Sequence, residues 1–149
     1  MACDEGFDQP TLQFSFQIDE AGESPFVAVL LAAEIAPKFG PRDERPFSIL
    51  ASDQQGVFIG GANGQSHWRW LYVRHFFVAP EWRRRGLGRR LMAQVEALAR
   101  ARECVGIYLD TFEESAARFY ESCGFARCGG IENFPPGAAR IYLKKELFF

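Results

Sequence analysis

Apolar and polar residues alternate along this chain with two different periods. Residues 12–18 alternate strictly, with Leu12, Phe14, Phe16 and Ile18 set against polar neighbours, which is the pattern of a half-buried strand. From residue 87 onward the apolar positions instead recur at spacings of three and four, so they share one face of a helix over about residues 86–102. The positions on that face are Leu87, Leu91, Val95, Leu98 and Ala99. The chain therefore combines strands with at least one amphipathic helix.

The remaining pattern predicts further helices and strands. A helix begins at Ser24 and Pro25, and Pro37, Gly40 and Pro41 end it. Gly60 and Gly61 lie inside a predicted strand and indicate either a bulge or a close approach of backbone. The predicted strands cover residues 47–51, 57–62, 68–78, 105–111, 125–128 and 139–147, a short helix covers 115–122, and loops cover 63–67 and 129–137.

Strand, helix and strand follow one another within residues 68–111. The two strands of such a unit are parallel and joined by a right-handed crossover. A chain of 149 residues is expected to form one domain, residues 1–149, with a loose terminus at 1–10.

Composition narrows the class of protein. The formal net charge is −2, so we expect no bulk attraction to nucleic acid. We also expect no membrane span and no signal peptide, because no apolar run is long enough. The cysteines form no Cys-x-x-Cys pair, so we predict free thiols in the cytoplasm and no metal site. They are Cys3, Cys104, Cys123 and Cys128.

A cluster of arginines stands out against this acidic background. It falls between the predicted strand and the helix, in the pattern Arg83-x-x-Gly86-x-Gly88. A glycine turn ahead of a helix presents free backbone N–H groups and the positive end of the helix dipole, which together bind phosphate. The spacing is neither Gly-x-Gly-x-x-Gly nor a P-loop. The alternative interpretation is a basic helix start on a solvated surface.

A second motif follows downstream. Ala116, Tyr120, Gly124 and Phe125 fit the pattern Asn-x-x-Ala-x-x-x-Tyr-x-x-x-Gly-Phe, with Glu113 in place of Asn. Taken with the arginine loop, this pattern resembles the GNAT family of N-acetyltransferases. The resemblance covers residues 24–147 in element order and 76–125 in specific motifs. Alone, Tyr120 would be read as a core tyrosine with a locally satisfied hydroxyl.

The resemblance implies a fold and a co-substrate. The fold is α/β (α+β), a single-domain GNAT fold with a mixed central sheet of about six to seven strands, helices on both faces, and a parallel pair splayed around the cofactor. The co-substrate is acetyl-CoA, with the pantetheine arm pairing to the strand at 76–78 and the pyrophosphate on the amides of residues 84–89. The cofactor-binding residues it implies are Phe76, Phe77, Val78, Arg83, Arg84, Arg85, Gly86, Leu87, Gly88, Arg89, Glu113, Ala116 and Tyr120.

The same resemblance implies direct acetyl transfer to an amine in a ternary complex. Tyr120, with an ordinary pKa of about 10, suits a general acid for a thiolate leaving group of pKa about 8.5. His75 is the candidate base, although alternation places it opposite Phe76 and Val78 unless a bulge intervenes. Other candidate bases are Tyr72, Glu113, Glu114, Glu132 and a water molecule.

The acceptor is less defined. A primary amine of a small molecule is our main expectation, and a protein acceptor or a non-catalytic acyl-CoA sensor are alternatives. Carboxylates near the expected mouth either attract a cationic amine or form a solvated acidic face; they are Asp110, Glu113, Glu114 and Glu132. Aromatic residues either line a pocket or belong to the core; they are Trp68, Trp70, Phe112 and Phe134. The resemblance also suggests a homodimer. A nucleic-acid-binding domain is disfavoured by Glu81, Glu96 and the net charge.

Overall fold

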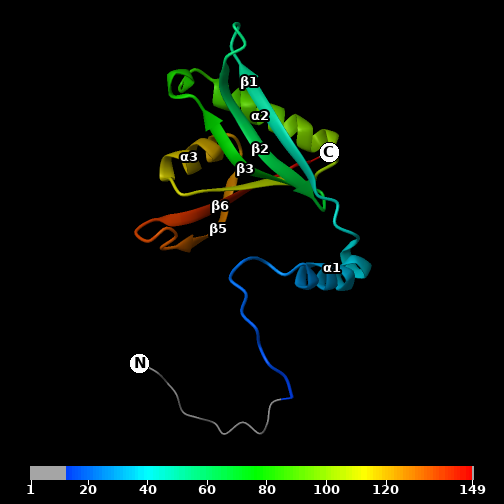
Figure 1. Cartoon of the computed structure of the whole chain (residues 1–149). Coiled ribbons are helices and arrows are strands. Elements are labelled where there is room, and N and C mark those ends of the chain that lie inside the picture. The colour runs from blue at the N-terminus through cyan, green and yellow to red at the C-terminus, as the bar shows by residue number, and fades with distance from the viewer. Residues whose placement is uncertain (1–12, 149) are drawn as a thin grey trace. The chain divides into compact units, whose positions relative to one another are not determined.

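The computed structural model describes residues 13–148 (Figure 1). The chain divides into an N-terminal unit, residues 1–41, and a C-terminal unit, residues 42–149. The expected loose terminus at residues 1–10 lies outside the described residues. No helix within residues 13–148 is long and apolar enough to span a membrane.

The N-terminal unit contains one helix, α1 (Pro25–Phe39), with Pro25 in its first turn as predicted. The predicted end at Pro37, Gly40 and Pro41 is confirmed, and of these three residues it is Gly40 that caps the helix, which continues through Pro37. Gly40 has a φ of 89° and its amide donates to the Ala36 carbonyl (2.8 Å). A proline forbids one backbone hydrogen bond but keeps a helical φ, so the chain can turn once more before a glycine stops it.

The strand predicted at residues 12–18 is also wrong for the part that the structure describes. Residues 13–18 have no strand partner, and Phe14, Phe16 and Ile18 are exposed. Alternation favours a strand, but a strand forms only where another backbone completes its hydrogen bonds. Leu12 lies outside the described residues.

The C-terminal unit is built on a six-stranded mixed sheet. Its strands are β1 (Arg45–Ser52), β2 (Phe58–His67), β3 (Trp70–Val78), β4 (Gly106–Thr111), β5 (Ala126–Glu132) and β6 (Ala139–Glu146). They lie in the order β1-β2-β3-β4-β6-β5, and the β3–β4 pair alone is parallel within this sheet. The predicted fold class is therefore confirmed. The loop predicted at residues 129–137 is shorter, because β5 pairs with β6 as far as Glu132.

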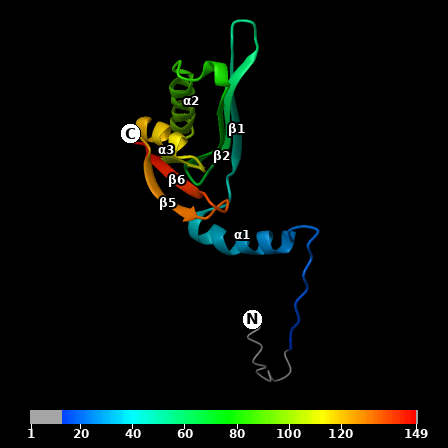
Figure 2. The same ribbon diagram turned by 90° about the vertical axis from the view of Figure 1, so that its left-hand side faces the viewer.

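Two helices cover one face of this sheet (Figure 2). They are α2 (Leu87–Ala101) and α3 (Glu114–Ser122), both close to the predicted bounds. Their apolar faces pack against Leu71, Val73, Ile107 and Leu109 of the central strands. Each such buried side chain contributes roughly 1.5–3 kcal/mol. A helix on the second face stays a prediction, because α1 belongs to the other unit.

A bulge interrupts β3 where it passes β2. Asn63 pairs with His75 but Gly64 pairs with Val73, so Arg74 is the extra residue. The bulge shifts the alternation by one residue: Leu71 and Val73 face the helices before it, and Phe76 packs against the same core after it. A Cβ on Gly64 would lie 1.8 Å from the Tyr72 carbonyl oxygen, so this position accepts no side chain without movement.

The loop predicted at residues 63–67 is wrong, since these residues complete β2. The reversal lies at Trp68 and Arg69, whose φ values are 48° and 62°. Asn63-Gly64 is a turn signal in sequence, but here its glycine serves the bulge. At Gly60, close approach explains the glycine, because a Cβ there would lie 2.8 Å from the Phe77 carbonyl oxygen.

We expect Gly64→Ala to destabilise the C-terminal unit, because the added methyl group would collide with strand backbone. Overpacking of this kind costs about 1–3 kcal/mol, measured as a lower midpoint in urea unfolding. The control is Gly22→Ala, where nothing lies within 4 Å of the added Cβ. Equal midpoints for the two variants would contradict this account of the bulge.

Candidate active site

The parallel strands β3 and β4 separate part of the way along their length. Pairing runs from Trp70 with Gly106 to Val73 with Leu109 and then stops. Beyond it, β3 continues through the bulge to Val78 while still paired to β2, so its other edge has unpaired backbone groups toward β4. The predicted splay is confirmed. An unpaired strand edge can pair with an extended ligand that has its own amides.

This edge leads into the arginine loop. After Val78 come a short 3₁₀ turn, Pro80–Trp82, and Gly86, which precedes α2 with a left-handed φ of 84°. The start of α2 has no side-chain cap and no acidic residue in its first turn. The amide of Arg90 bonds back to the Gly86 carbonyl (3.2 Å), which leaves the amides ahead of it without helical partners. The backbone N–H groups that the sequence predicted to be free at this helix start are present, and anion binding there stays a prediction.

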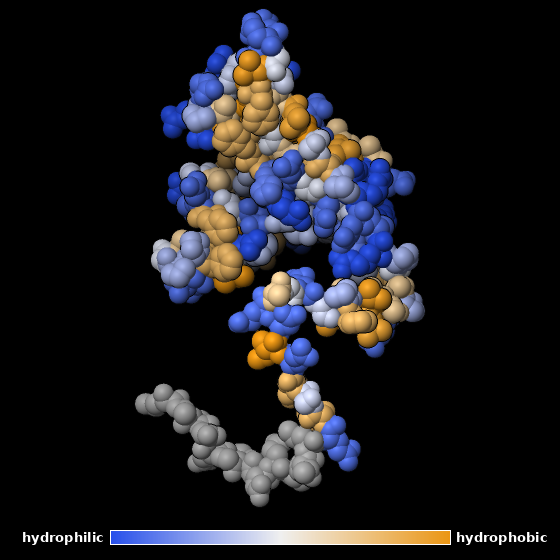
Figure 3. All heavy atoms as spheres, in the orientation of Figure 1, coloured by the Kyte–Doolittle hydropathy of each residue, from blue (hydrophilic) through white to orange (hydrophobic). Residues whose placement is uncertain are grey.

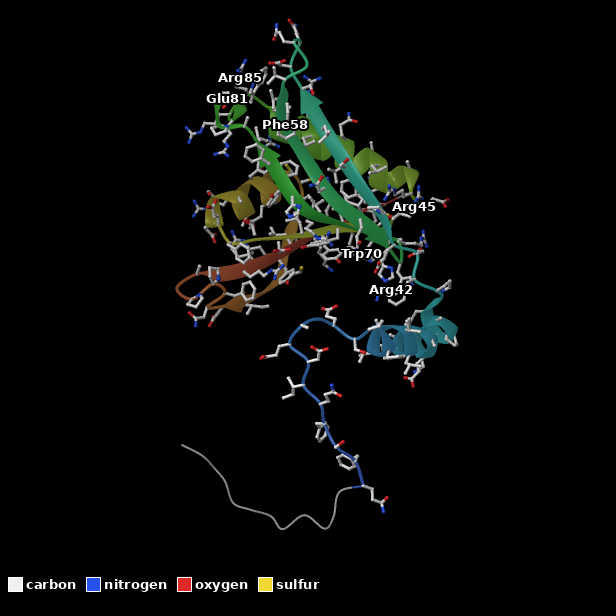
Figure 4. The ribbon with its side chains drawn as sticks, in the orientation of Figure 1. Arg42, Arg45, Phe58, Trp70, Glu81 and Arg85 are labelled. Atoms are coloured by element: carbon white, nitrogen blue, oxygen red, sulfur yellow. The ribbon has the colours of Figure 1, made fainter. Side chains whose placement is uncertain are left out.

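The arginines of the loop are held in different ways. Arg83 Nε donates to the Val78 carbonyl oxygen (2.9 Å), tying the loop to the end of β3. Arg85 lies over the Trp82 ring, 4.1 Å from its centroid. Arg89 donates from Nη1 to the Ser122 carbonyl (3.2 Å) and from Nη2 to its hydroxyl (3.0 Å), so it joins α2 to α3. Arg84 has a positive φ of 60°. Figure 4 shows Arg85 and Glu81 together in this loop, at the end of the sheet away from Trp70.

Close packing of α2 on α3 completes this side of the site. A Cβ on Gly88 would lie 3.0 Å from Phe119 Cζ, so the second glycine of the motif allows the two helices to approach. Glu113, which replaces the family asparagine, precedes α3, and its own amide donates to the Thr111 hydroxyl (3.2 Å). Its side chain is exposed and caps nothing. Ala116 packs against the core.

Tyr120 lies on the buried face of α3 and is 7% exposed. Its ring meets the ring of Phe76 edge-on, with centroids 5.8 Å apart, so the helix is in contact with the splayed part of β3. Burial, and then the charges of Cys123 and Asp110, raise the pKa of Tyr120 to about 12. The hydroxyl therefore keeps its proton at neutral pH, as a general acid must.

His75 is not near Tyr120 in this arrangement. The bulge leaves it exposed, on the opposite side of β3 from Phe76, which contacts Tyr120. Two of the alternative bases are occupied. Tyr72 donates its hydroxyl to Asp110 Oδ1 (2.7 Å), and burial and that bond raise its pKa to about 12. Glu114 binds Arg127 (2.6 Å), which lowers the pKa of its carboxyl group.

A cluster that the sequence did not predict lies beside the splay. Asp110 follows Leu109, the last residue of β4 that pairs with β3. Its Oδ2 accepts a hydrogen bond from Arg140 Nε of β6 (2.9 Å). The Arg140 guanidinium lies 5.2 Å from the ring centroids of both Phe134 and Tyr142. The one signal available was alternation, which puts Arg140 and Tyr142 on the same face of a strand. No group of His, Cys, Asp or Glu within residues 13–148 is arranged to hold a metal ion.

Comparison with known proteins agrees with this geometry. The sequence profile of the Acetyltransferase (GNAT) family matches residues 13–125. Acetyltransferase Atu2258 of Agrobacterium fabrum is 33% identical over 87% of this chain and 91% of its own length. Blasticidin-S acetyltransferase of Streptomyces morookaense is 35% identical over 79% of this chain and 88% of its own.

A solved acetyltransferase of Bacillus cereus has the same fold, with a TM-score of 0.78 at 22% identity, over 88% of this chain and 98% of that one. The chain therefore belongs to the GNAT family, and it is an enzyme of the acetyl-CoA-dependent N-acetyltransferase class.

Two tyrosines of the site should differ in what their hydroxyl groups contribute to stability. Tyr72→Phe removes a hydrogen bond to a carboxylate and should cost about 1.5–3 kcal/mol in urea unfolding. Tyr120→Phe removes a hydroxyl with no hydrogen bond to another described residue, so the free energy of unfolding should change by less than about 1 kcal/mol. An equal or larger loss for Tyr120→Phe would favour the interpretation of Tyr120 as a structural tyrosine.

Proposed function

We propose that this enzyme transfers an acetyl group from acetyl-CoA directly to a primary amine of a small molecule, within a ternary complex. One observation supports this most: the unpaired edge of β3 leads directly to the uncapped start of α2. An extended amide-bearing arm followed by a diphosphate matches that succession of backbone groups and helix amides.

In this proposal the pantetheine arm pairs with the backbone of residues 76–78. The pyrophosphate lies on the amides of residues 84–89, beside the charges of Arg83, Arg84 and Arg85. Arg89 is held by Ser122, so Arg90 is the better candidate for the ribose phosphate. The starts of the two helices lie along the cofactor in this proposal. Leu87 and Gly88 belong to the start of α2, and Glu113 and Ala116 to the start of α3.

The chemistry needs three proton transfers. A lysine-like amine with a pKa of about 10.4 costs roughly 4–5 kcal/mol to deprotonate at pH 7, and His75 or a water molecule takes that proton. The neutral amine attacks the thioester carbonyl, and a backbone N–H near Val78 stabilises the oxyanion. When the carbon–sulfur bond breaks, Tyr120 gives its proton to the departing thiolate and takes up the proton that the amine nitrogen loses as the amide forms. The products are the N-acetylated amine and coenzyme A.

One comparison bears on the choice between a small-molecule acceptor and the alternative functions. One relative is named for blasticidin S, a small molecule, which supports a small-molecule acceptor. A protein acceptor and a non-catalytic sensor are the second and third candidates. A cytoplasmic location and a homodimer stay predictions, as does the absence of nucleic-acid and membrane partners.

Calorimetric titration with acetyl-CoA tests the cofactor site. We expect wild type to bind and Arg83→Ala/Gly86→Glu to lose binding by at least tenfold, because the variant adds negative charge where the diphosphate lies. Gly56→Glu is the matched control: its φ of +78° resembles the +84° of Gly86, and nothing lies within 4 Å of either added Cβ. No binding by wild type would refute the proposed function.

Steady-state kinetics of Tyr120→Phe test whether Tyr120 is a general acid, a role that an enzyme needs and a non-catalytic sensor does not. Loss of a general acid should lower kcat by about 10²–10⁴-fold and leave the Kd for acetyl-CoA unchanged. Because the folded-state pKa of Tyr120 is about 12, the acid is protonated throughout the neutral range. Deprotonation of the Tyr120 hydroxyl should therefore not limit the rate until the pH rises toward that value. An unchanged kcat would remove Tyr120 from the mechanism.

A further inference from the structure

The cluster around Arg140 suggests which amines this enzyme accepts. We propose that the Arg140 guanidinium binds a carboxylate of the acceptor, so that the substrates are small amines with an acidic group, of the amino-acid type. This inference rests on the proposed function, because it assigns the acceptor side of the same site.

The first reason for this proposal is that Asp110 is already engaged by other residues. It lies at the opening between β3 and β4 and would be the obvious partner for a cationic amine, as the sequence suggested. However, its side chain is only 9% exposed, and both of its oxygens already accept, from the Tyr72 hydroxyl (2.7 Å) and from Arg140 Nε (2.9 Å). Its charge is balanced by the guanidinium, so it is a positioning residue for Arg140.

Arg140 itself is the second reason. Asp110 engages its Nε, the Tyr72 hydroxyl is within reach of one further guanidinium N–H, and the remaining N–H groups of the terminal nitrogens make no hydrogen bond to residues 13–148. Its side chain remains 25% exposed. The two terminal nitrogens can therefore receive the two oxygens of a carboxylate side by side, the geometry that guanidinium groups favour.

The aromatic residues around Arg140 fix its orientation. Its guanidinium lies 5.6, 5.2 and 5.2 Å from the ring centroids of Phe112, Phe134 and Tyr142. Phe112 and Phe134 stack on each other, with centroids 5.7 Å apart and planes 8° apart. Figure 3 shows apolar residues gathered at the β5–β6 end of this unit, beside hydrophilic ones. Such walls reduce the hydration of a bound ion pair and strengthen it.

The position of the Arg140 cluster places it beside the proposed site of acetyl transfer. Thr111 and Asp110 belong to the part of β4 that no longer pairs with β3, across the splay from the strand edge on which the pantetheine arm is proposed to lie. A substrate whose carboxylate is held at Arg140 has the rest of its length free to bring an amine to the splay. Exposed Glu113 and Glu132 form no ion pair with another residue of 13–148 and can attract that amine.

The test compares acceptors that differ only at the acid. Glycine, β-alanine, 4-aminobutyrate, 6-aminohexanoate, lysine and phenylalanine are assayed beside their carboxamides, by coenzyme A release at saturating acetyl-CoA. We expect the best acid to exceed its amide by at least tenfold in kcat/KM, which is about 1.4 kcal/mol. Arg140→Gln should reduce that ratio to within about twofold, while activity on the amide persists. Arg140→Lys keeps the charge without the planar fork and should give an intermediate ratio.

Arg127→Gln is the control variant. Arg127 also binds carboxylates, those of Glu114 and Glu121, but it lies outside the cluster, so its variant should keep the wild-type ratio. The KM for acetyl-CoA should be the same in all these proteins.

Three results would overturn the proposal: amides used as well as acids, a preference that survives Arg140→Gln, or acetyl-CoA binding without turnover of any acid. Failure to bind acetyl-CoA would instead refute the proposed function itself.

Discussion

The point at which β3 and β4 stop pairing is the constraint on which the rest of the site depends. Parallel strands normally continue side by side, but here the extra residue Arg74 lies directly after the last paired residue, Val73. The bulge separates the end of β3 from β4, while β3 stays paired with β2. Gly64 permits the bulge because a side chain there would collide with the Tyr72 carbonyl oxygen. The unpaired backbone and the contact of Phe76 with Tyr120 both follow from that separation.

The sequence predicted those parts of the site that are encoded locally. The periodicity of residues 87–99 and the glycines at 86 and 88 are properties of one short segment, so the helix, its uncapped start and the preceding turn could be read directly. Tyr120 and Ala116 could be placed together because their motif lies on a single helix, α3. The β-α-β unit was also predictable, since its strands and helix are consecutive.

The remainder depends on contacts between distant segments. Nothing in the sequence shows that residues 12–18 would lack a strand partner, or that the glycine of Asn63-Gly64 would serve a bulge instead of a turn. The Tyr72–Asp110–Arg140 cluster joins three strands, and its register comes from pairings such as Asp110 with Tyr142. A carboxylate in the sequence looks available until its partner is known, which is why Asp110 appeared to be a candidate for binding the amine.

Charge balance explains how a protein of net charge −2 can offer a site to anions. Some arginines of the C-terminal unit bind carboxylates: Arg127 binds Glu114 and Glu121, and Arg100 binds Glu96. Arg83 in the loop before α2 and Arg89 in the first turn of α2 instead donate to the neutral oxygens of Val78 and Ser122. Such bonds fix a guanidinium without cancelling its charge, so its field adds to that of the helix start. Arg140 is the intermediate case, because Asp110 balances its charge but binds only its Nε. In the functions that we propose, the unit attracts an anion by charge at the start of α2 and selects one by shape at Arg140.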